Sequence, residues 1–160
     1  MAITNICGFE TGAGGADNLT GAGGNDILIG GTGIDTLVGG LGNDTFKWTT
    51  AGEGKDVISD FTLGNLDPGN GALNADADVL DLSDVLGGIA PLVAAVNADN
   101  SGTVDDYISF TVVGTTATLR VDSDGLGGAG PVDLASFSVV SGTTASSLLN
   151  DLLANNQIGV

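Results

Sequence analysis

A nine-residue pattern repeats four times without a gap near the start of this 160-residue chain. The blocks cover residues 12–20, 21–29, 30–38 and 39–47, and each reads small, small, x, Gly, x, Asp, x, apolar, x. Position six is always aspartate, and position eight is always a large apolar residue, namely Leu19, Leu28, Leu37 and Phe46. A short, strict period of this kind indicates structural repeats that stack on one another.

Each block is predicted to form a tight six-residue turn followed by a three-residue strand. Glycine at positions one and four suits a turn whose backbone needs positive φ. The middle residue of the strand, at position eight, is expected to point into a core. Stacking pairs each turn with the turn 18 residues later, so Asp17 should face Asp35 and Asp26 should face Asp44.

The turns combine backbone carbonyls with one carboxylate each, and both are hard oxygen ligands. Calcium accepts six to eight such oxygens in flexible geometry, whereas zinc prefers histidine and thiolate. The chain has no histidine and one cysteine, which excludes a typical zinc site. The sequence therefore predicts calcium ligands from the repeat aspartates and from the carbonyls of positions one and three. These candidates are Asp17, Asp26, Asp35, Asp44, Gly12, Gly14, Gly21, Gly23, Gly30, Thr32, Gly39 and Leu41.

A weaker fifth block follows at residues 51–59, after a three-residue interruption that begins at Trp48. It places Asp56 at position six, where this residue is expected beyond Asp35. Asp60 is either an outer ligand or a solvated carboxylate at a strand end. Trp48 and Phe61 are expected to cap the apolar core of the repeats rather than to contact a ligand. Together with a further candidate loop at residues 122–127, these sites are expected to hold about two to four calcium ions.

The charge of the chain supports a requirement for cations. Twenty acidic residues stand against three basic ones, which gives a net charge of −17. Such a chain repels itself and also repels phosphate, so nucleic acid and anionic membranes are unsuitable partners. No apolar run is long enough to suggest membrane insertion. We expect the protein to be largely unfolded without calcium and folded with it.

The remaining sequence predicts a β-rich cap. Residues 64–77 are expected to form an inserted loop, and residues 107–113 and 117–121 flank a turn and should form a hairpin. The loop at residues 122–127 partly matches a calcium loop, with Asp122 and Asp124 as candidate ligands. Leucines at 148, 149, 152 and 153 predict a short terminal helix.

These predictions define an all-β chain with a short right-handed parallel β-roll followed by a β-rich C-terminal cap and a short terminal helix. The expected boundaries are a degenerate lead-in at residues 1–11, a calcium-binding roll at 12–63 and a β-rich cap at 64–160.

The repeats, together with Asp56-Val-Ile-Ser-Asp-Phe and Asp78-Val-Leu-Asp-Leu-Ser-Asp, resemble the C-terminal target domain of type I secreted RTX proteins, notably large RTX adhesins. This resemblance implies an uncleaved C-terminal export signal, passage through an ABC transporter as an unfolded chain, and folding on extracellular calcium. It also implies a secreted or cell-surface location in a Gram-negative bacterium. The chain would then be a monomeric module of a larger protein.

Two other functions remain open at the sequence level. The module could bind carbohydrate or another surface through calcium, or it could be an RTX module attached to a secreted enzyme. An enzyme within the chain itself is not expected, because it has no histidine, no Gly-x-Ser-x-Gly motif and no His-Glu-x-x-His motif.

Overall fold

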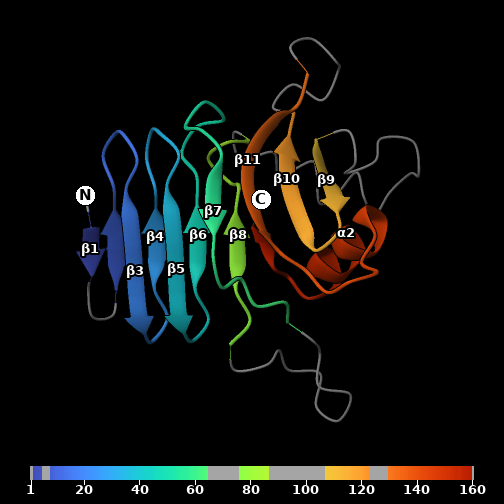
Figure 1. The fold of residues 1–160 in the computed structure, drawn as a ribbon, viewed down its shortest axis with the longest axis horizontal. Coiled ribbons are helices and arrows are strands. Elements are labelled where there is room, and N and C mark those ends of the chain that lie inside the picture. The colour runs from blue at the N-terminus through green and yellow to red at the C-terminus, as the bar shows by residue number, and fades with distance from the viewer. Residues whose placement is uncertain (1, 5–7, 65–75, 87–106, 123–129, 160) are drawn as a thin grey trace.

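The computed structural model describes residues 2–4, 8–64, 76–86, 107–122 and 130–159. Within these ranges the chain is dominated by strands, with one short helix (Figure 1), which is consistent with the expected roll. The strands are β1 (Ala2–Thr4), β2 (Phe9–Thr11), β3 (Asn18–Gly23), β4 (Ile27–Ile29), β5 (Thr36–Leu41), β6 (Thr45–Lys47), β7 (Asp56–Ile58), β8 (Val79–Asp81), β9 (Ile108–Val113), β10 (Thr116–Val121), β11 (Val132–Ser138) and β12 (Ile158–Gly159). The helix is α2 (Ala145–Ala154).

Successive strands of the repeats alternate between two sheets. One sheet has the order β1-β3-β5-β7-β11-β10-β9, and the other has the order β12-β8-β6-β4-β2. Within the repeats all pairs are parallel, and partners lie 18 residues apart, as in Asn18 with Thr36 and Ile27 with Thr45. The predicted stacking of alternate blocks is therefore confirmed.

Strands from the second half of the chain complete both sheets. In the first sheet β11 pairs parallel with β7 and antiparallel with β10, so strand directions are mixed. In the second sheet β8 pairs with β6, and β12 then pairs with β8. The boundary predicted near residue 63 stays a prediction, but strands on both sides of it share hydrogen bonds.

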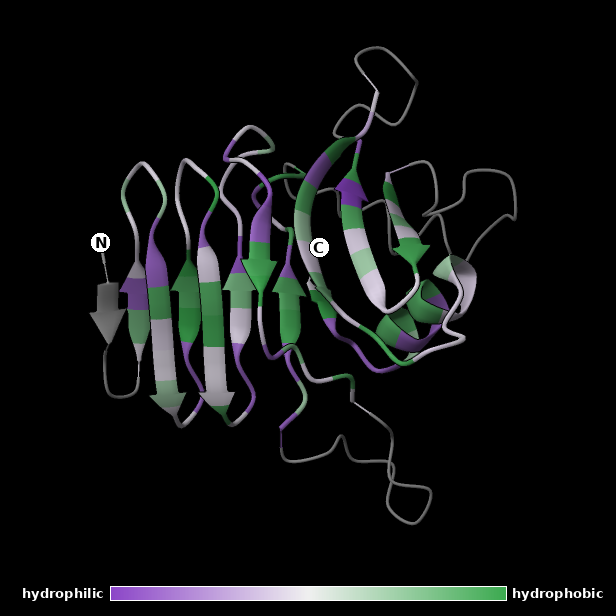
Figure 2. Cartoon of the chain, viewed as in Figure 1, coloured by the Kyte–Doolittle hydropathy of each residue, from purple (hydrophilic) through white to green (hydrophobic). Residues whose placement is uncertain are grey.

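One apolar core runs through the repeats and the cap. The four position-eight residues are fully buried, as predicted, and so is Trp48. Figure 2 shows hydrophobic positions recurring from strand to strand along the stack. Ring contacts continue this core into the cap: Phe61 lies 6.1 Å from Phe46 and 4.7 Å from Phe137, and Phe137 lies 6.1 Å from Phe110. The stack and the cap therefore do not have separate interiors.

The expected hairpin and helix are both present. β9 and β10 are antiparallel around Gly114, whose φ of 64° suits the tight turn. The helix begins after Thr144, which exchanges capping hydrogen bonds with Ser147. Its buried face consists of Leu148, Leu149 and Leu152, and it lies beside β9 (Figure 1). No helix among the described residues is long and apolar enough to cross a membrane.

Gln157 fastens the end of the chain to the stack. Its side chain is fully buried, accepts from Gly64 N at 2.8 Å, and donates to Thr62 O at 2.9 Å and to Asp78 O at 2.7 Å. Its backbone carbonyl accepts from Leu80 N at 2.8 Å. One amide thus connects three segments that are distant in sequence.

Replacing Gln157 with Ala should destabilise the calcium-loaded protein by about 3 kcal/mol, because buried backbone groups lose their partners. The measurement is urea denaturation in saturating calcium. The control Asn150→Ala changes an exposed residue of the preceding helix α2 and should shift stability by no more than about 0.5 kcal/mol. Equal denaturation midpoints for the two variants would contradict this role for Gln157.

Candidate metal centre

The position-six aspartates of alternate turns form a hydrogen-bonded ladder. Asp17 N donates to Asp35 Oδ1 at 2.8 Å, and Asp35 N donates to Asp56 Oδ1 at 3.0 Å. We call these three residues the first ladder. The expected pairing of Asp17 with Asp35 is confirmed, and Asp56 lies beyond Asp35 as predicted.

A second ladder runs through the other set of turns. It starts at Gly8, whose N–H donates to Asp26 Oδ1. Asp26 N then donates to Asp44 Oδ1 at 2.9 Å, and Asp44 N donates to Asp78 Oδ1 at 3.0 Å. The predicted pairing of Asp26 with Asp44 is therefore confirmed. The second ladder consists of Asp26, Asp44 and Asp78.

Asp78 was not predicted as a site residue, although the sequence carried a signal for it. Asp78-Val79-Leu80 has the same order, Asp-x-apolar, as Asp56-Val57-Ile58. The register of β8 against β6, with Val79 opposite Thr45, places Asp78 at a position-six site. Because of the inserted residues, Asp78 follows Asp44 by 34 positions instead of 18, which obscured the period.

The inner aspartates each keep one buried oxygen unused. Asp26 Oδ2, Asp35 Oδ2 and Asp44 Oδ2 have no hydrogen-bond partner in the part of the chain that the structure describes. The same holds for Glu53 Oε2 and for both carboxylate oxygens of Glu10. We call these the open oxygens. A buried charged oxygen is costly unless a partner or a cation compensates it, so the open oxygens point to a bound cation.

The ladder ends differ from the inner residues. Asp56 Oδ2 accepts from Trp48 Nε1 at 2.9 Å, and Asp78 Oδ2 accepts from Thr62 N at 2.7 Å. At the opposite end of the first ladder, Asp17 Oδ2 accepts from Ala13 N at 3.3 Å. Trp48 is part of the core, as predicted, but its ring N–H also binds a predicted ligand, which the sequence did not indicate.

The position-one glycines leave room in which oxygens collect. A Cβ added to Gly21, Gly30 or Gly39 would come within 2.6, 2.6 or 2.2 Å of the open oxygen of the aspartate in the same turn. A Cβ on Gly12 would come within 2.1 Å of Gly30 O. Carboxylate and carbonyl oxygens thus gather where a side chain would otherwise lie. This all-oxygen surrounding fits calcium.

The position-three residues lie at the stacked turns as expected, although two of their carbonyls already accept hydrogen bonds. Thr32 O accepts from Gly15 N and Leu41 O accepts from Gly24 N, both at 2.8 Å. Gly14 bridges to Thr32, and Gly23 pairs with Leu41. The side chain of Leu41 is exposed, so only its carbonyl could face a metal.

Asp60 closes the last turn of the second set. Its Oδ1 accepts from Gly39 N at 3.0 Å and its Oδ2 accepts from Gly40 N at 2.9 Å. Both oxygens therefore bind backbone amides, while the side chain is only partly buried. Whether Asp60 also contacts a metal stays a prediction.

The second predicted loop is described only at Asp122. Asp124 lies outside the described residues. Asp122 N donates to Tyr107 O at 2.8 Å, which closes the open end of the hairpin. Its role as a ligand stays a prediction.

Glu10 is a buried carboxylate that sequence reasoning missed. It lies opposite Leu28 in the strand register and therefore occupies a core position at the first coil of the second sheet. Burial raises its pKa, and the charge of Asp26 adds to the rise. Its position 18 residues before Leu28 was the available signal.

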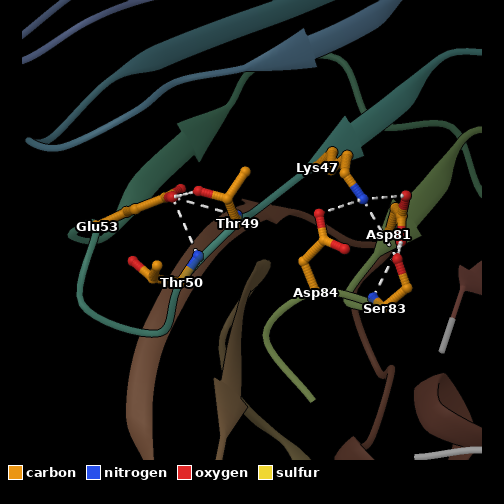
Figure 3. Close-up of polar contacts among 7 residues, drawn as sticks. All are labelled: Lys47, Thr49, Thr50, Glu53, Asp81, Ser83 and Asp84. Carbon is orange, nitrogen blue, oxygen red and sulfur yellow. Dashed lines mark hydrogen bonds and ion pairs between the residues drawn. The ribbon is translucent and has the colours of Figure 1, made fainter. Parts of the chain in front are cut away.

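Carboxylates outside the ladders form ordinary ion pairs with lysine. Lys47 Nζ forms ion pairs with Asp81 at 3.0 Å and Asp84 at 2.9 Å, and it donates to Ser83 Oγ at 3.2 Å (Figure 3). These carboxylates have a cation, whereas the open oxygens do not.

Burial is the largest influence on the pKa of four ladder residues. It raises the pKa of Asp56 to about 6 and that of Asp78 to about 7, against hydrogen bonds that lower both. Burial also raises the pKa of Asp35 and of Asp44. Within the described ranges, no group of three or more acidic, histidine or cysteine side chains is already arranged to hold a metal.

Comparison with protein families identifies the repeats directly. Residues 11–46 match the RTX calcium-binding nonapeptide repeat in four copies. This part of the chain is thus a block of RTX repeats, which bind calcium, and it supports a calcium-binding module of a secreted protein. RTX repeat proteins are typically secreted by Gram-negative bacteria. No curated protein matches the chain.

Replacing Asp35 or Asp44 with Asn should raise the calcium concentration at half-folding about tenfold, a cost of roughly 1.4 kcal/mol. Asparagine keeps an Oδ1 acceptor for the ladder but puts an amide where the open oxygen lies. Circular dichroism during calcium titration is the measurement. The control Asp84→Asn removes the same charge from an exposed ion pair, and it should leave the midpoint unchanged.

Without calcium, folding should be favoured by mild acid. Asp78 has a folded pKa of about 7 against an ordinary 3.8, so the unfolded chain releases its proton first as the pH rises. Stability is therefore lost between about pH 4 and pH 7. In chelator, helix and strand signals should be stronger at pH 4.5 than at pH 7.5. The calcium concentration at half-folding should not fall over the same rise, because calcium must then supply the stability that protonation supplies at lower pH. Equal signals at the two pH values in chelator would contradict this assignment.

Proposed function

We propose that this chain is a calcium-gated folding module of a type I secreted protein. The observation that carries the proposal is the set of open oxygens on Asp26, Asp35 and Asp44, which lie buried in a chain with a net charge of −17. A cation that binds only the folded state compensates these charges. At a hundredfold its dissociation constant, each calcium ion contributes about 2.7 kcal/mol to folding.

In this proposal the alternating parallel strands are a right-handed β-roll, and calcium ions lie between its stacked turns. The 18-residue register and the two aspartate ladders support this arrangement. The space at the position-one glycines supports it as well, since oxygens rather than side chains occupy that space.

The C-terminal part of the chain acts in export in this proposal. Its resemblance to RTX target domains supports an uncleaved signal that a type I ABC transporter recognises. In the folded protein Leu148, Leu149 and Leu152 are buried, so an unfolded chain would present them to the transporter. Low calcium inside the cell would keep the chain unfolded, and external calcium would fold it and oppose its return.

The parent protein is proposed to be an adhesin, and the module itself is proposed to have no catalytic activity. The absence of histidine and of hydrolase motifs from the sequence supports the second point. A carbohydrate-binding module and a module appended to an enzyme remain the alternatives. Glycan binding that disappears with chelator would favour the first of them.

Calcium should convert the purified chain from largely unfolded to folded, because it compensates the ladder carboxylates. Circular dichroism and size-exclusion chromatography in chelator, in calcium and in magnesium measure this change. Magnesium should have little effect, since it demands strict octahedral geometry. The proposal fails if the strand signal in chelator equals the signal in calcium at pH 7.5.

A further inference from the structure

Glu53 occupies an unusual place in the turn between β6 and β7. It stands at position three of the fifth block, which is Gly14 or Thr32 in the turns stacked before it. Gly33 N donates to Glu53 O at 2.5 Å, so this turn lies directly on the turn of residues 30–35. Only 4% of Glu53 is exposed. A buried carboxylate therefore appears where the other turns of this set offer only a carbonyl or a hydroxyl.

The two oxygens of Glu53 have different surroundings. Oε1 accepts from Thr49 N and Thr50 N, both at 3.1 Å, and from Thr49 Oγ1 (Figure 3). These bonds fix the side chain and close the turn. Oε2 is an open oxygen. The closure of the turn thus accounts for one oxygen and leaves the other for a ligand.

Two more carboxylates lie in the same pair of turns, Asp35 in one and Asp56 in the other. A Cβ on Gly30 would lie 2.6 Å from Asp35 Oδ2 and 3.1 Å from Asp56 Oδ2. Burial raises the pKa of both aspartates, and the negative charge of Glu53 adds to each rise. Lys55 gives these groups no ion pair in the structure, since its ammonium lies 3.5 Å from Asp133 in the cap.

We propose that Glu53 is a side-chain calcium ligand, whose Oε2 joins the open oxygen of Asp35 at the gap between the turns of residues 30–35 and 51–56. This inference rests on the proposed calcium binding of the turns and adds a ligand that the repeat pattern does not contain. Because like charges repel, the carboxylates of Glu53 and Asp35 can approach each other only around a cation. An extra carboxylate raises calcium affinity, and this gap should therefore fill before the others.

Trp48 provides a local reporter for this gap. It is the only tryptophan of the chain, it is fully buried, and its Nε1 donates to Asp56 Oδ2. A cation that binds at Asp35 and Glu53 changes the field at this indole. In wild-type protein, Trp48 emission should therefore change at lower calcium than the far-ultraviolet circular dichroism.

The test compares wild-type protein with Glu53→Gln. Glutamine keeps an oxygen for the Thr49 and Thr50 donors but replaces Oε2 with an amide. The calcium midpoint of Trp48 emission should rise at least tenfold, and the titrated stoichiometry should fall by one ion. The control Asp84→Asn removes an exposed carboxylate that pairs with Lys47 outside the ladders, and it should leave the Trp48 midpoint unchanged. A Glu53→Gln midpoint within twofold of wild type overturns the inference.

A second measurement separates ligation from turn closure and does not need Glu53→Gln to fold. In Glu10→Gln protein Glu53 is the sole glutamate, so [13C]glutamate labelling isolates its carboxylate stretch in the infrared. The band should shift when strontium replaces calcium, because a ligating carboxylate senses the ion. An identical band with both ions overturns the inference. Failure of wild-type protein to bind calcium at all would instead refute the proposed function.

Discussion

The hydrogen bond from the backbone N–H of one position-six aspartate to the carboxylate of the aspartate in the next stacked turn organises this protein. It recurs at 2.8 to 3.0 Å in both ladders. Because it uses Oδ1, it directs Oδ2 toward the glycines of the same turn. The bond sets the strand register and the position of the open oxygens at once. The fold and the metal site therefore cannot be separated.

The buried carboxylates of the ladders destabilise the fold. Without a cation, only the burial of the apolar core would offset that cost. Each coil contributes only about two large core residues, such as Leu19 and Leu28, so a short stack has little hydrophobic surface to bury. The contact of Phe61 with both Phe46 and Phe137 joins this narrow core to that of the cap. The stack gains a covered end, and the cap gains an ordered sheet edge at β7 on which β11 pairs.

The parts of the stack that follow the period could be predicted from the sequence, as could the hairpin and the terminal helix from their local patterns. The long-range contacts that break the period could not. The strict nine-residue repeat sufficed for the core positions and for the pairing of Asp17 with Asp35. Asp78 was not predicted as a site residue because an insertion separates it from Asp44, and only the strand pairing shows its register. The pairing of β12 with β8 joins residues nearly 80 positions apart, for which a local pattern holds no information. Glu53 was not predicted as a ligand because its proposed role depends on which of its two oxygens the turn uses.

The ends of the ladders explain why the requirement for a cation is confined to their interior. At Asp56 and Asp78 the second oxygen receives a protein N–H, from Trp48 and from Thr62, and these donors come from segments that interrupt the repeat. A continuing regular turn would offer no such donor and would leave another open oxygen. The interruptions therefore terminate the ladder chemically as well as geometrically. Since Trp48 and Thr62 flank the segment that contains Glu53, the same departure from the repeat that closes Asp56 also supplies an extra buried carboxylate in the turn stacked on that of Asp35.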